Sequence, residues 1–171
     1  MNNQILSSAK ELVEYLKKHN LKIATAESCT GGMVSAYITA VSGASSVFEM
    51  GITSYSNRIK NQTLKVDGNT LETKGAVSGD TALQMAQNIR NISGADIGVS
   101  VTGVAGPAPQ DGHPAGVIFI GISCKDTTNF YKFEIEPSDR TYVREQAVLL
   151  LLNKLLETLK TDKEKRYVSK L

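Results

Sequence analysis

The chain has 171 residues, 41% of them hydrophobic and 21% charged, which suits a single globular domain with its own core. Its formal net charge is +2, and no lysine–arginine stripe interleaved with aromatic residues appears, so no nucleic-acid partner is expected. The longest apolar run, Ala147 to Leu152, is too short to cross a bilayer, and Met1 to Gln4 lack a secretory signal pattern. We therefore expect a cytoplasmic protein with no membrane partner.

Two cysteines and two histidines limit the chemistry that the chain can support. Cys29 and Cys124 are too few for a disulfide scaffold and lack the spacing of metal ligands. His19 and His113 cannot by themselves form a histidine-rich metal centre. We predict reduced thiols, no metal and no cofactor.

The first half of the chain alternates helical and strand patterns. Apolar residues at helical spacing predict an amphipathic helix near 4–18. A strand near 21–26, a turn of small residues and a helix to about Ala40 follow. Residues 48–55 have the pattern of a second strand, which we expect to end in a polar loop at 56–58.

The second half adds a capped helix, a buried strand, a hairpin and a closing helix. Ser78 is a suitable N-cap for a helix to about Ile92, with Gly94 as its stop. Residues 97–101 have the apolar content of a buried strand. The two strands of the hairpin are predicted at 117–122 and 130–135. The buried stripe of the closing helix is predicted to consist of Val143, Ala147, Val148, Leu151, Leu152, Leu155, Leu156 and Leu159.

Strands mixed with helices, together with one hairpin, predict a three-layer α/β/α sandwich. Its sheet would be mixed and mostly parallel, with about five strands and one antiparallel hairpin strand. Residues 1–160 would form one domain, and the charged, aperiodic residues 161–171 a frayed tail. Two loops rich in small residues, at Ser28 and at Thr102, follow strand ends. Open α/β sheets bind ligands at this edge.

The most informative segment is Ala26-Glu27-Ser28-Cys29-Thr30-Gly31-Gly32, between the first strand and the second helix. A small-residue turn at this place lifts the Ser28 hydroxyl to the rim of the sheet and leaves backbone N–H groups unpaired beside it. Acyl-transfer sites present a nucleophile next to its oxyanion donors in this way. Ser28 is the first candidate nucleophile. Cys29 is a rival, or else a small buried apolar residue.

Ser28 needs a base, and both histidines lie in segments expected to face solvent. A lysine can act as the base if burial lowers its pKa toward neutrality. Lys60, just after the second strand, is the best-placed lysine, and Tyr55 could orient a proton relay between Lys60 and Ser28. The alternative is that Lys60 solvates the outer face of a short helix.

Other residues could support a substrate. Glu27 could fix a lysine or the substrate, or serve as a cap charge, and Thr102 could contact the substrate or only bond backbone. The loop 103–106 could wrap a phosphate through its N–H groups. Arg140 and Arg144, one helical turn apart, could form a phosphate fork, or be exposed helix charges. No Gly-x-x-x-x-Gly-Lys-Ser/Thr pattern appears, which argues against a nucleoside-triphosphate kinase or ATPase.

Taken together, these blocks resemble one family in order and spacing. It is the CinA C-terminal domain family, which includes stand-alone nicotinamide-nucleotide amidohydrolases of the PncC type. The resemblance covers roughly residues 5 to 160. It is carried by Ala26 to Gly32, Tyr55-Ser56-Asn57 with Lys60, Gly75-Ala76-Val77-Ser78, Thr102 to Pro107, and Asp139-Arg140 with Arg144.

The resemblance implies a small-molecule nucleotide substrate: nicotinamide mononucleotide, deamidated to nicotinate mononucleotide and ammonia in pyridine-nucleotide recycling. It implies a metal-free mechanism with Ser28 as nucleophile, Lys60 as base and Tyr55 as catalytic partner, in a protein that is often a homodimer. We expect backbone N–H groups near Cys29 to Gly31 to hold the oxyanion, and the 102–106 loop and the arginines to hold ribose and phosphate. The expected substrate-binding residues are Glu27, Cys29, Thr30, Gly31, Thr102, Gly103, Gly106, Arg140 and Arg144.

Two departures from the family pattern bear on the substrate. Residues 108–113 replace the Asp-Gly-Gly that commonly follows Gly-Pro, so this loop could differ in shape. Residues 137–138 stand where glycine commonly precedes Asp139, which leaves open whether Arg140 or Arg144 meets the phosphate. Two other functions stay open: a catalytically silent nucleotide- or partner-binding domain, and an amidase for another ring carboxamide.

Overall fold

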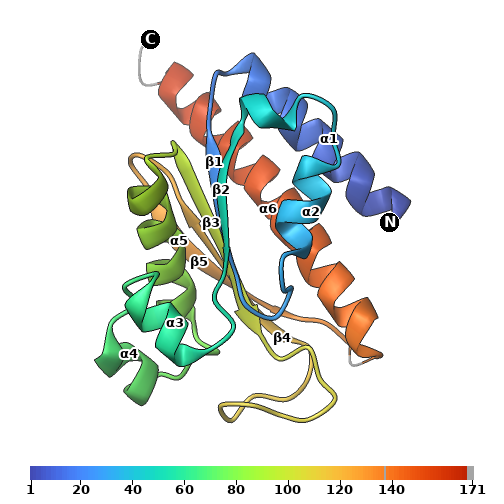
Figure 1. Cartoon of the computed structure of the whole chain (residues 1–171). Coiled ribbons are helices and arrows are strands. Elements are labelled where there is room, and N and C mark those ends of the chain that lie inside the picture. The colour runs from blue at the N-terminus through green and yellow to red at the C-terminus, as the bar shows by residue number, and fades with distance from the viewer. Residues whose placement is uncertain (137, 169–171) are drawn as a thin grey trace.

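Helices and strands alternate in the first third of the chain, and three helices, three strands and a closing helix follow (Figure 1). The computed structural model describes residues 1–136 and 138–168, with side chains described up to residue 161. The elements are α1 (Asn3–Lys18), β1 (Ile23–Glu27), α2 (Met33–Thr39), the 3-10 turn η1 (Ala44–Ser46), β2 (Phe48–Thr53), α3 (Asn57–Gln62), α4 (Gly68–Thr73), α5 (Gly79–Ser93), β3 (Ile97–Gly103), β4 (Val117–Ser123), β5 (Thr128–Glu134) and α6 (Arg140–Val168).

The strands form one mixed sheet in the order β2-β1-β3-β4-β5. β1 pairs in parallel with both β2 and β3, whereas β4 runs antiparallel to β3 and to β5. The predicted sheet, mostly parallel with one antiparallel hairpin strand, is confirmed. After β1 the chain continues to β2 on one side, and after β3 it continues to β4 on the other. The carboxyl ends of β1 and β3 therefore flank the crevice in which such sheets bind ligands.

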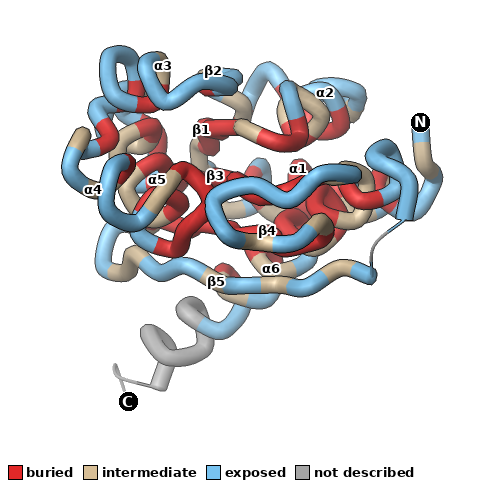
Figure 2. The backbone as a smooth tube through the Cα atoms, turned by 90° about the horizontal axis from the view of Figure 1, so that it is seen from below, coloured by how far each residue is buried: buried red, intermediate tan, exposed pale blue. Residues whose placement is uncertain are grey.

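Helices cover both faces of the sheet, which confirms the predicted three layers. α1, α2 and α6 lie on one face and α3, α4 and α5 on the other (Figure 1). The first face buries leucines of α1 and α6 against the strands, and every residue of the stripe predicted for the closing helix is buried. On the second face, Met85 and Ile89 of α5 pack on Ala24 and Ala26 of β1. Figure 2 shows the buried central strands from below, with exposed loops around them.

The predicted capping of α5 is confirmed. The Ser78 hydroxyl accepts from the Thr81 N–H, and Gly94 ends the helix at φ 70° in the left-handed region that glycine adopts without strain. The turn residues thus fix both ends of the helix that covers the second face of the sheet.

Two expectations about the connecting segments differ from the structure. Residues 57 and 58, expected in a polar loop, begin α3, because the Ser56 hydroxyl caps this helix by accepting from the Ile59 N–H. The short helix α4, capped by Asp67, was not predicted. α6 continues through Val168, and residues 169–171 lie outside the described part of the chain, so the frayed tail at 161–171 stays a prediction.

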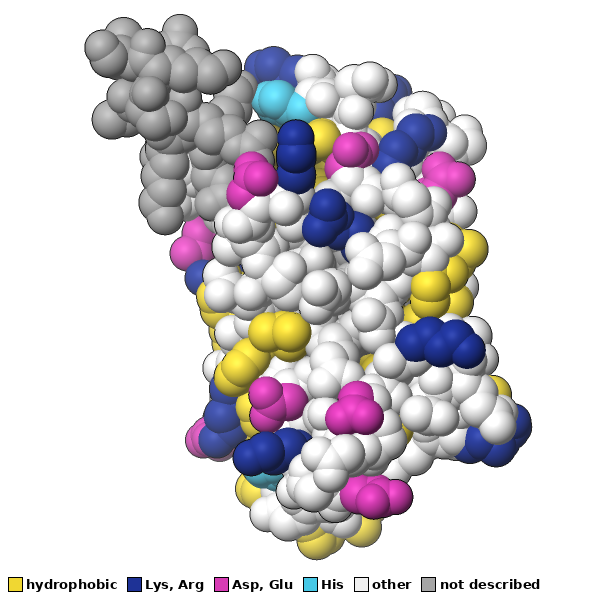
Figure 3. Space-filling view, turned by 90° about the vertical axis from the view of Figure 1, so that its left-hand side faces the viewer, with side chains coloured by type: hydrophobic (Ala, Val, Ile, Leu, Met, Phe, Trp, Pro, Cys, Tyr) yellow, Lys and Arg dark blue, Asp and Glu magenta, His cyan; other side chains and the backbone are white. Residues whose placement is uncertain are grey.

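The surface carries charge of both signs. On the face shown in Figure 3, basic and acidic side chains are interspersed and form no continuous basic stripe. Within residues 1–136 and 138–168, no helix has the length and apolar content that a membrane crossing requires.

Candidate active site

The turn between β1 and α2 presents Ser28 at the carboxyl edge of the sheet. The Ser28 N–H donates to the carbonyl of Val101 in β3 at 2.9 Å, and the Gly31 N–H donates back to the Ser28 carbonyl at 3.1 Å. Gly31 and Gly32 have φ values of 60° and 96°, a left-handed conformation that L side chains rarely adopt. The two glycines allow the tight turn that places Ser28 at the rim.

Lys60 extends from α3 into the interior and reaches Ser28 directly. Its side chain is only 1% exposed, and Nζ lies 2.8 Å from the Ser54 carbonyl oxygen and 2.9 Å from Ser28 Oγ. Burial lowers the pKa of Lys60 from 10.5 to about 8, while the negative charge of Asp111 acts in the opposite direction. Lys60 is therefore a buried amine and does not solvate the outer face of its helix.

The two contacts of Nζ orient the amine for proton transfer. A neutral amine has two N–H groups and one lone pair, and the Ser54 carbonyl can accept only from an N–H. The lone pair is then free to face Ser28 Oγ, so that the serine hydroxyl donates to Nζ when Lys60 is neutral. This is the arrangement that a general base requires, with 2.9 Å between the heavy atoms.

Tyr55 lies beside this pair and not between its members. Its side chain is 61% exposed, and its hydroxyl accepts a 2.7 Å hydrogen bond from Nη2 of Arg140. Nη1 of Arg140 donates to the Gly106 carbonyl at 2.8 Å. Arg140 thus joins Tyr55 to the loop after β3, and the direct contact between Ser28 and Lys60 needs no relay through the phenol.

A cleft of about 300 Å³ opens over Ser28 and Lys60, a volume suited to a small molecule. Among its described lining residues, Lys60 and Arg140 are basic and none is acidic, which favours an anionic ligand. The expected site residues that the cleft brings together are Ser28, Cys29, Tyr55, Lys60, Thr102, Gly103, Gly106 and Arg140. Thr102 is 1% exposed, and its hydroxyl donates to the Ala76 carbonyl at 2.8 Å.

Glu27, for which a contact to a lysine or the substrate and a cap charge were both open, holds the start of α2 as a cap charge. One carboxylate oxygen accepts from the N–H groups of Gly32 and Val34, at 2.9 and 3.0 Å. The other accepts from the N–H and the hydroxyl of Ser35, at 2.9 and 2.7 Å. With 1% exposure, Glu27 does not reach the cleft, because four donors of the following helix surround its charge.

The two arginines of α6 lie on different sides of the Ser28 turn. Arg140 lines the cleft, whereas Arg144 donates from Nε to the Cys29 carbonyl at 3.1 Å and from Nη2 to the Thr30 carbonyl at 2.7 Å. Thr30 and Gly31 themselves do not line the cleft, and Thr30 is fully buried. Arg140 is therefore the arginine that a ligand in the cleft can reach.

Cys29 is a poor rival for Ser28. It is 6% exposed and packs in the core formed by α1, α2 and α6. Burial raises the pKa of Cys29 to about 12, so the thiol keeps its proton near neutral pH. The thiolate is the nucleophilic form of cysteine, and the structure therefore favours the interpretation of Cys29 as a small buried residue.

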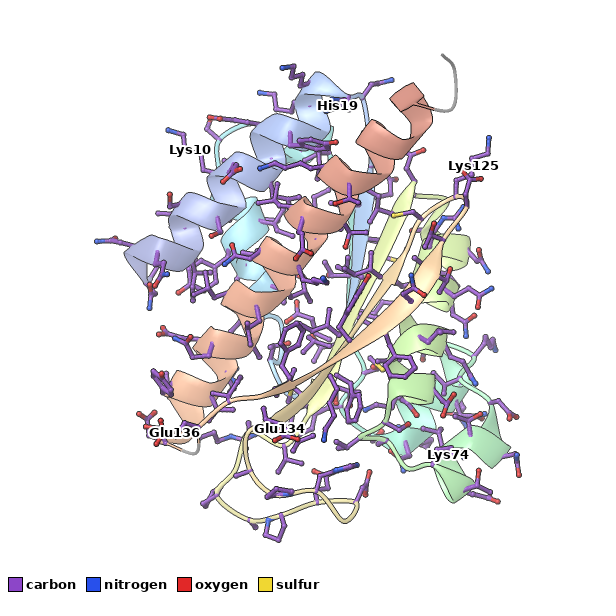
Figure 4. All side chains as sticks on the ribbon, turned by 180° about the vertical axis from the view of Figure 1, so that it is seen from behind. Lys10, His19, Lys74, Lys125, Glu134 and Glu136 are labelled. Carbon is purple, nitrogen blue, oxygen red and sulfur yellow. The ribbon has the colours of Figure 1, made fainter. Side chains whose placement is uncertain are left out.

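Neither histidine lines the cleft. His19 stacks on Tyr15, with ring centroids 4.1 Å apart, at the end of the molecule remote from Glu134 (Figure 4). His113 lies edge-on to Phe119 at 5.7 Å. In the described part of the chain, no group of three or more His, Cys, Asp and Glu side chains is arranged to hold a metal ion.

Two features of the site were not predicted. The backbone carbonyl of Ser54, which holds the amine of Lys60, has no side-chain signal in the sequence. Asp111 accepts from the Val77 N–H at 3.1 Å and so fastens the 107–114 loop to the turn before α5. An aspartate before glycine is typical of a turn, but its partner lies 34 residues away and only the fold reveals it.

The fold and the site define a class: an α/β protein with a serine–lysine pair at the switch point of a mixed sheet. Residues 5–159 match the sequence model of the CinA C-terminal domain, and the chain belongs to this family. The match spans about 37% of the length of a relative from Bacillus pumilus (strain SAFR-032), named as a competence-damage inducible protein. The two are 42% identical over 154 residues, which are 90% of this chain.

Solved structures share the fold. The competence damage-inducible protein A (ComA) of Klebsiella pneumoniae superposes with a TM-score of 0.88 at 30% identity, over 91% of this chain and 97% of that one. The competence or damage-inducible protein of Enterobacter asburiae gives a TM-score of 0.88 at 34% identity, over 92% and 99% of the two chains. The fold is thus that of proteins which the chain matches over nearly their whole solved length.

Proposed function

We propose that the protein is a serine–lysine amidohydrolase that deamidates nicotinamide mononucleotide to nicotinate mononucleotide and ammonia. The contact between Lys60 Nζ and Ser28 Oγ, with the amine buried and its pKa lowered to about 8, is the observation on which the proposal depends. A lysine that is neutral in an appreciable fraction of molecules near neutral pH can activate a serine without a histidine.

Acylation begins when neutral Lys60 removes the proton of Ser28 and Oγ attacks the carboxamide carbon. The Oγ–C bond forms as the C=O electron pair moves to oxygen, and backbone N–H groups of the Ser28 turn hold that oxyanion. When the tetrahedral intermediate collapses, the C–N bond breaks and the Lys60 ammonium gives its proton to the departing nitrogen. Ammonia leaves, and an acyl ester remains on Ser28.

Deacylation uses the same groups, with water as the nucleophile and Ser28 as the leaving group. Water attacks the ester carbonyl while Lys60 takes a proton from it, and the Ser28–acyl bond then breaks. Lys60 returns the proton to Ser28 Oγ, and nicotinate mononucleotide leaves as the carboxylate. Each proton that Lys60 accepts is therefore returned within the cycle.

The cleft suits the phosphate of a mononucleotide. Arg140 uses one N–H for the Gly106 carbonyl and one for the Tyr55 hydroxyl, and a guanidinium has five. The remaining donors can bind a phosphate at the rim. Among the described residues that line the cleft, two are basic and none is acidic, which favours such an anion.

The test is ammonia release from purified nicotinamide mononucleotide by the wild type, Ser28→Ala, Lys60→Ala and Cys29→Ala. We expect activity in the wild type and in Cys29→Ala, and loss of at least about 10³-fold in Ser28→Ala and Lys60→Ala. An inert wild type would favour the alternative of a silent binding domain. A dead Cys29→Ala beside an active Ser28→Ala would overturn the choice of nucleophile.

A further inference from the structure

Two side-chain amides in the cleft have hydrogen-bonding capacity that the protein does not use. The polar side chains that line the cleft are those of Ser28, Tyr55, Asn57, Lys60, Thr102, Gln110 and Arg140. All but two of them hydrogen-bond to protein groups. Within residues 1–136 and 138–161, no hydrogen bond joins the carboxamide of Asn57 or that of Gln110 to another residue. These two amides are therefore available to a ligand in the cleft.

A tight hairpin fixes the backbone of Gln110. Its N–H donates to the His113 carbonyl at 3.0 Å, and the His113 N–H donates back to the Gln110 carbonyl at 2.9 Å. Asp111 and Gly112 between them have φ values of 49° and 74°, the left-handed pair that a two-residue hairpin turn requires. The Asp111 carboxylate accepts from the Val77 N–H and fastens the hairpin to the turn before α5. Gln110 is thus presented to the cleft by a pre-formed loop.

The loop that carries Gln110 connects two opposite sides of the cleft. At its beginning, the Gly106 carbonyl is held by Arg140, the first residue of α6. At the hairpin the loop reaches Val77, just before α5, and α5 covers the other face of the sheet. Gln110 therefore lies on the part of the rim between Arg140 and Val77.

The other unused amide belongs to the reacting end of the cleft. Asn57 is the first residue of α3 and precedes Lys60 by three residues. Residues three apart lie on the same face of a helix, so Asn57 lies beside the amine that contacts Ser28 Oγ. Asn57 and Gln110 thus serve different parts of a bound molecule.

A mononucleotide has three polar parts to match with these groups. Its carboxamide must lie at Ser28 and Lys60, where the reaction takes place, and its phosphate suits the unused N–H groups of Arg140. The ribose hydroxyls lie between these two parts. A side-chain amide offers both a donor and an acceptor, as does each hydroxyl, so one glutamine can bind a pair of neighbouring hydroxyl groups.

We infer that Gln110 is a substrate-binding residue that selects ribonucleotides by hydrogen bonding to the ribose hydroxyls. The inference rests on the proposed function, which sets the direction of the substrate in the cleft. It concerns the segment in which this chain departs from the common pattern of its family, so the preference belongs to this chain's own loop.

The experiment compares nicotinamide mononucleotide with its 2′,3′-dideoxy analogue in the wild type, Gln110→Ala, Asn57→Ala and Gln87→Ala. Gln87 is an exposed residue of α5 outside the cleft and is the matched control. In Gln110→Ala we expect kcat/KM for the mononucleotide to fall about tenfold, through KM, and kcat/KM for the analogue to stay unchanged. Gln87→Ala should match the wild type with both substrates, and Asn57→Ala should keep the preference for the hydroxylated substrate.

Two kinetic results would overturn the inference. An equal loss for both substrates in Gln110→Ala would mean that the residue only shapes the loop. A preference that disappears in Asn57→Ala and persists in Gln110→Ala would assign the hydroxyls to Asn57.

Calorimetric binding to Ser28→Ala, with and without Gln110→Ala, separates this inference from the proposed reaction. Binding that favours the ribonucleotide about tenfold, and only while Gln110 is present, would support the inference even if the wild type releases no ammonia. Hydrolysis by a wild type whose preference survives in Gln110→Ala would support the reaction and overturn the inference. An inert wild type together with no binding of nicotinamide mononucleotide would overturn both.

Discussion

Deamidation should accelerate as the pH rises through the pKa of Lys60. The amine lies 2.9 Å from Ser28 Oγ and must be neutral to accept the serine proton. Burial lowers the pKa of Lys60 to about 8, so the protonated and inactive form dominates at pH 7. The rate at neutral pH is thus limited by the fraction of neutral lysine.

The pKa sets the size of this effect. With a pKa of about 8, the neutral fraction of Lys60 is about one-eleventh at pH 7 and about ten-elevenths at pH 9. We therefore expect kcat/KM to rise about tenfold between these two pH values. Ammonia release, followed at constant ionic strength with Ser28→Ala as the blank, measures the profile, and circular dichroism checks that the protein stays folded at each pH.

Asp111→Asn offers a matched perturbation of the same pKa. The carboxylate of Asp111 raises the pKa of Lys60, so its removal should lower that pKa and shift the profile toward acid pH. The amide oxygen of asparagine can still accept from the Val77 N–H and hold the loop. Asp80→Asn, an exposed carboxylate in the first turn of α5, is the control and should leave the profile in place.

Two results would refute this account of Lys60. A profile that is flat between about pH 7 and 9 would mean that no group with this pKa limits the reaction. A shift of the Asp111→Asn profile toward alkaline pH would mean that the carboxylate does not act on the charge of Lys60 in the sense that the structure requires.

Three other substitutions have defined consequences. The raised pKa of Cys29 lowers stability as the pH rises above 9. Folding lowers the pKa of Lys60 from 10.5 to about 8, so this residue binds more protons in the unfolded chain between these pH values, and its contribution to stability should rise by up to about 3 kcal/mol from pH 8 to 10.5. Urea unfolding of Lys60→Met should lack this rise and show a more stable protein near pH 7. Arg140→Met should raise KM for nicotinamide mononucleotide about tenfold or more and leave the kinetics of the riboside unchanged, as steady-state assays with both substrates will show. Glu27→Gln should lower the free energy of unfolding by about 1–3 kcal/mol, measured in urea, because an NH2 group replaces an acceptor of α2 N–H groups.

Periodicity and small residues were sufficient to predict the fold and the turn that carries Ser28. The buried stripe of α6, the caps of α5 and the turn at Ser28 all depend on local patterns, which the sequence displays directly. The proposed role of Lys60 was harder to predict, because a lysine one turn into a short helix is usually exposed. Only the resemblance to the family favoured Lys60. Its burial depends on how α3 packs against the sheet edge, which no local pattern records.

The supporting contacts of the turn could not be predicted, because their partners are backbone atoms. Arg144 binds carbonyl groups 114 and 115 residues away in the chain, and Glu27 binds N–H groups that any residue at those positions would offer. Such contacts depend on where a peptide group points and not on which side chain it carries. For this reason Glu27 and Arg144 were assigned to the substrate from the sequence, whereas in the structure both bind backbone groups of the Ser28 turn and the start of α2.

The burial on which the proposed role of Lys60 depends also destabilises the fold. Each unit by which burial lowers the pKa of Lys60 raises its neutral fraction near pH 7 about tenfold and costs about 1.4 kcal/mol of stability at that pH. The Ser54 carbonyl does not remove this cost, because it accepts one N–H and leaves the charge of an ammonium largely unsolvated. A substitution that admits water to Nζ should therefore stabilise the protein and slow the reaction together. Selection for activity near neutral pH would act against a more stable, better solvated lysine at this position.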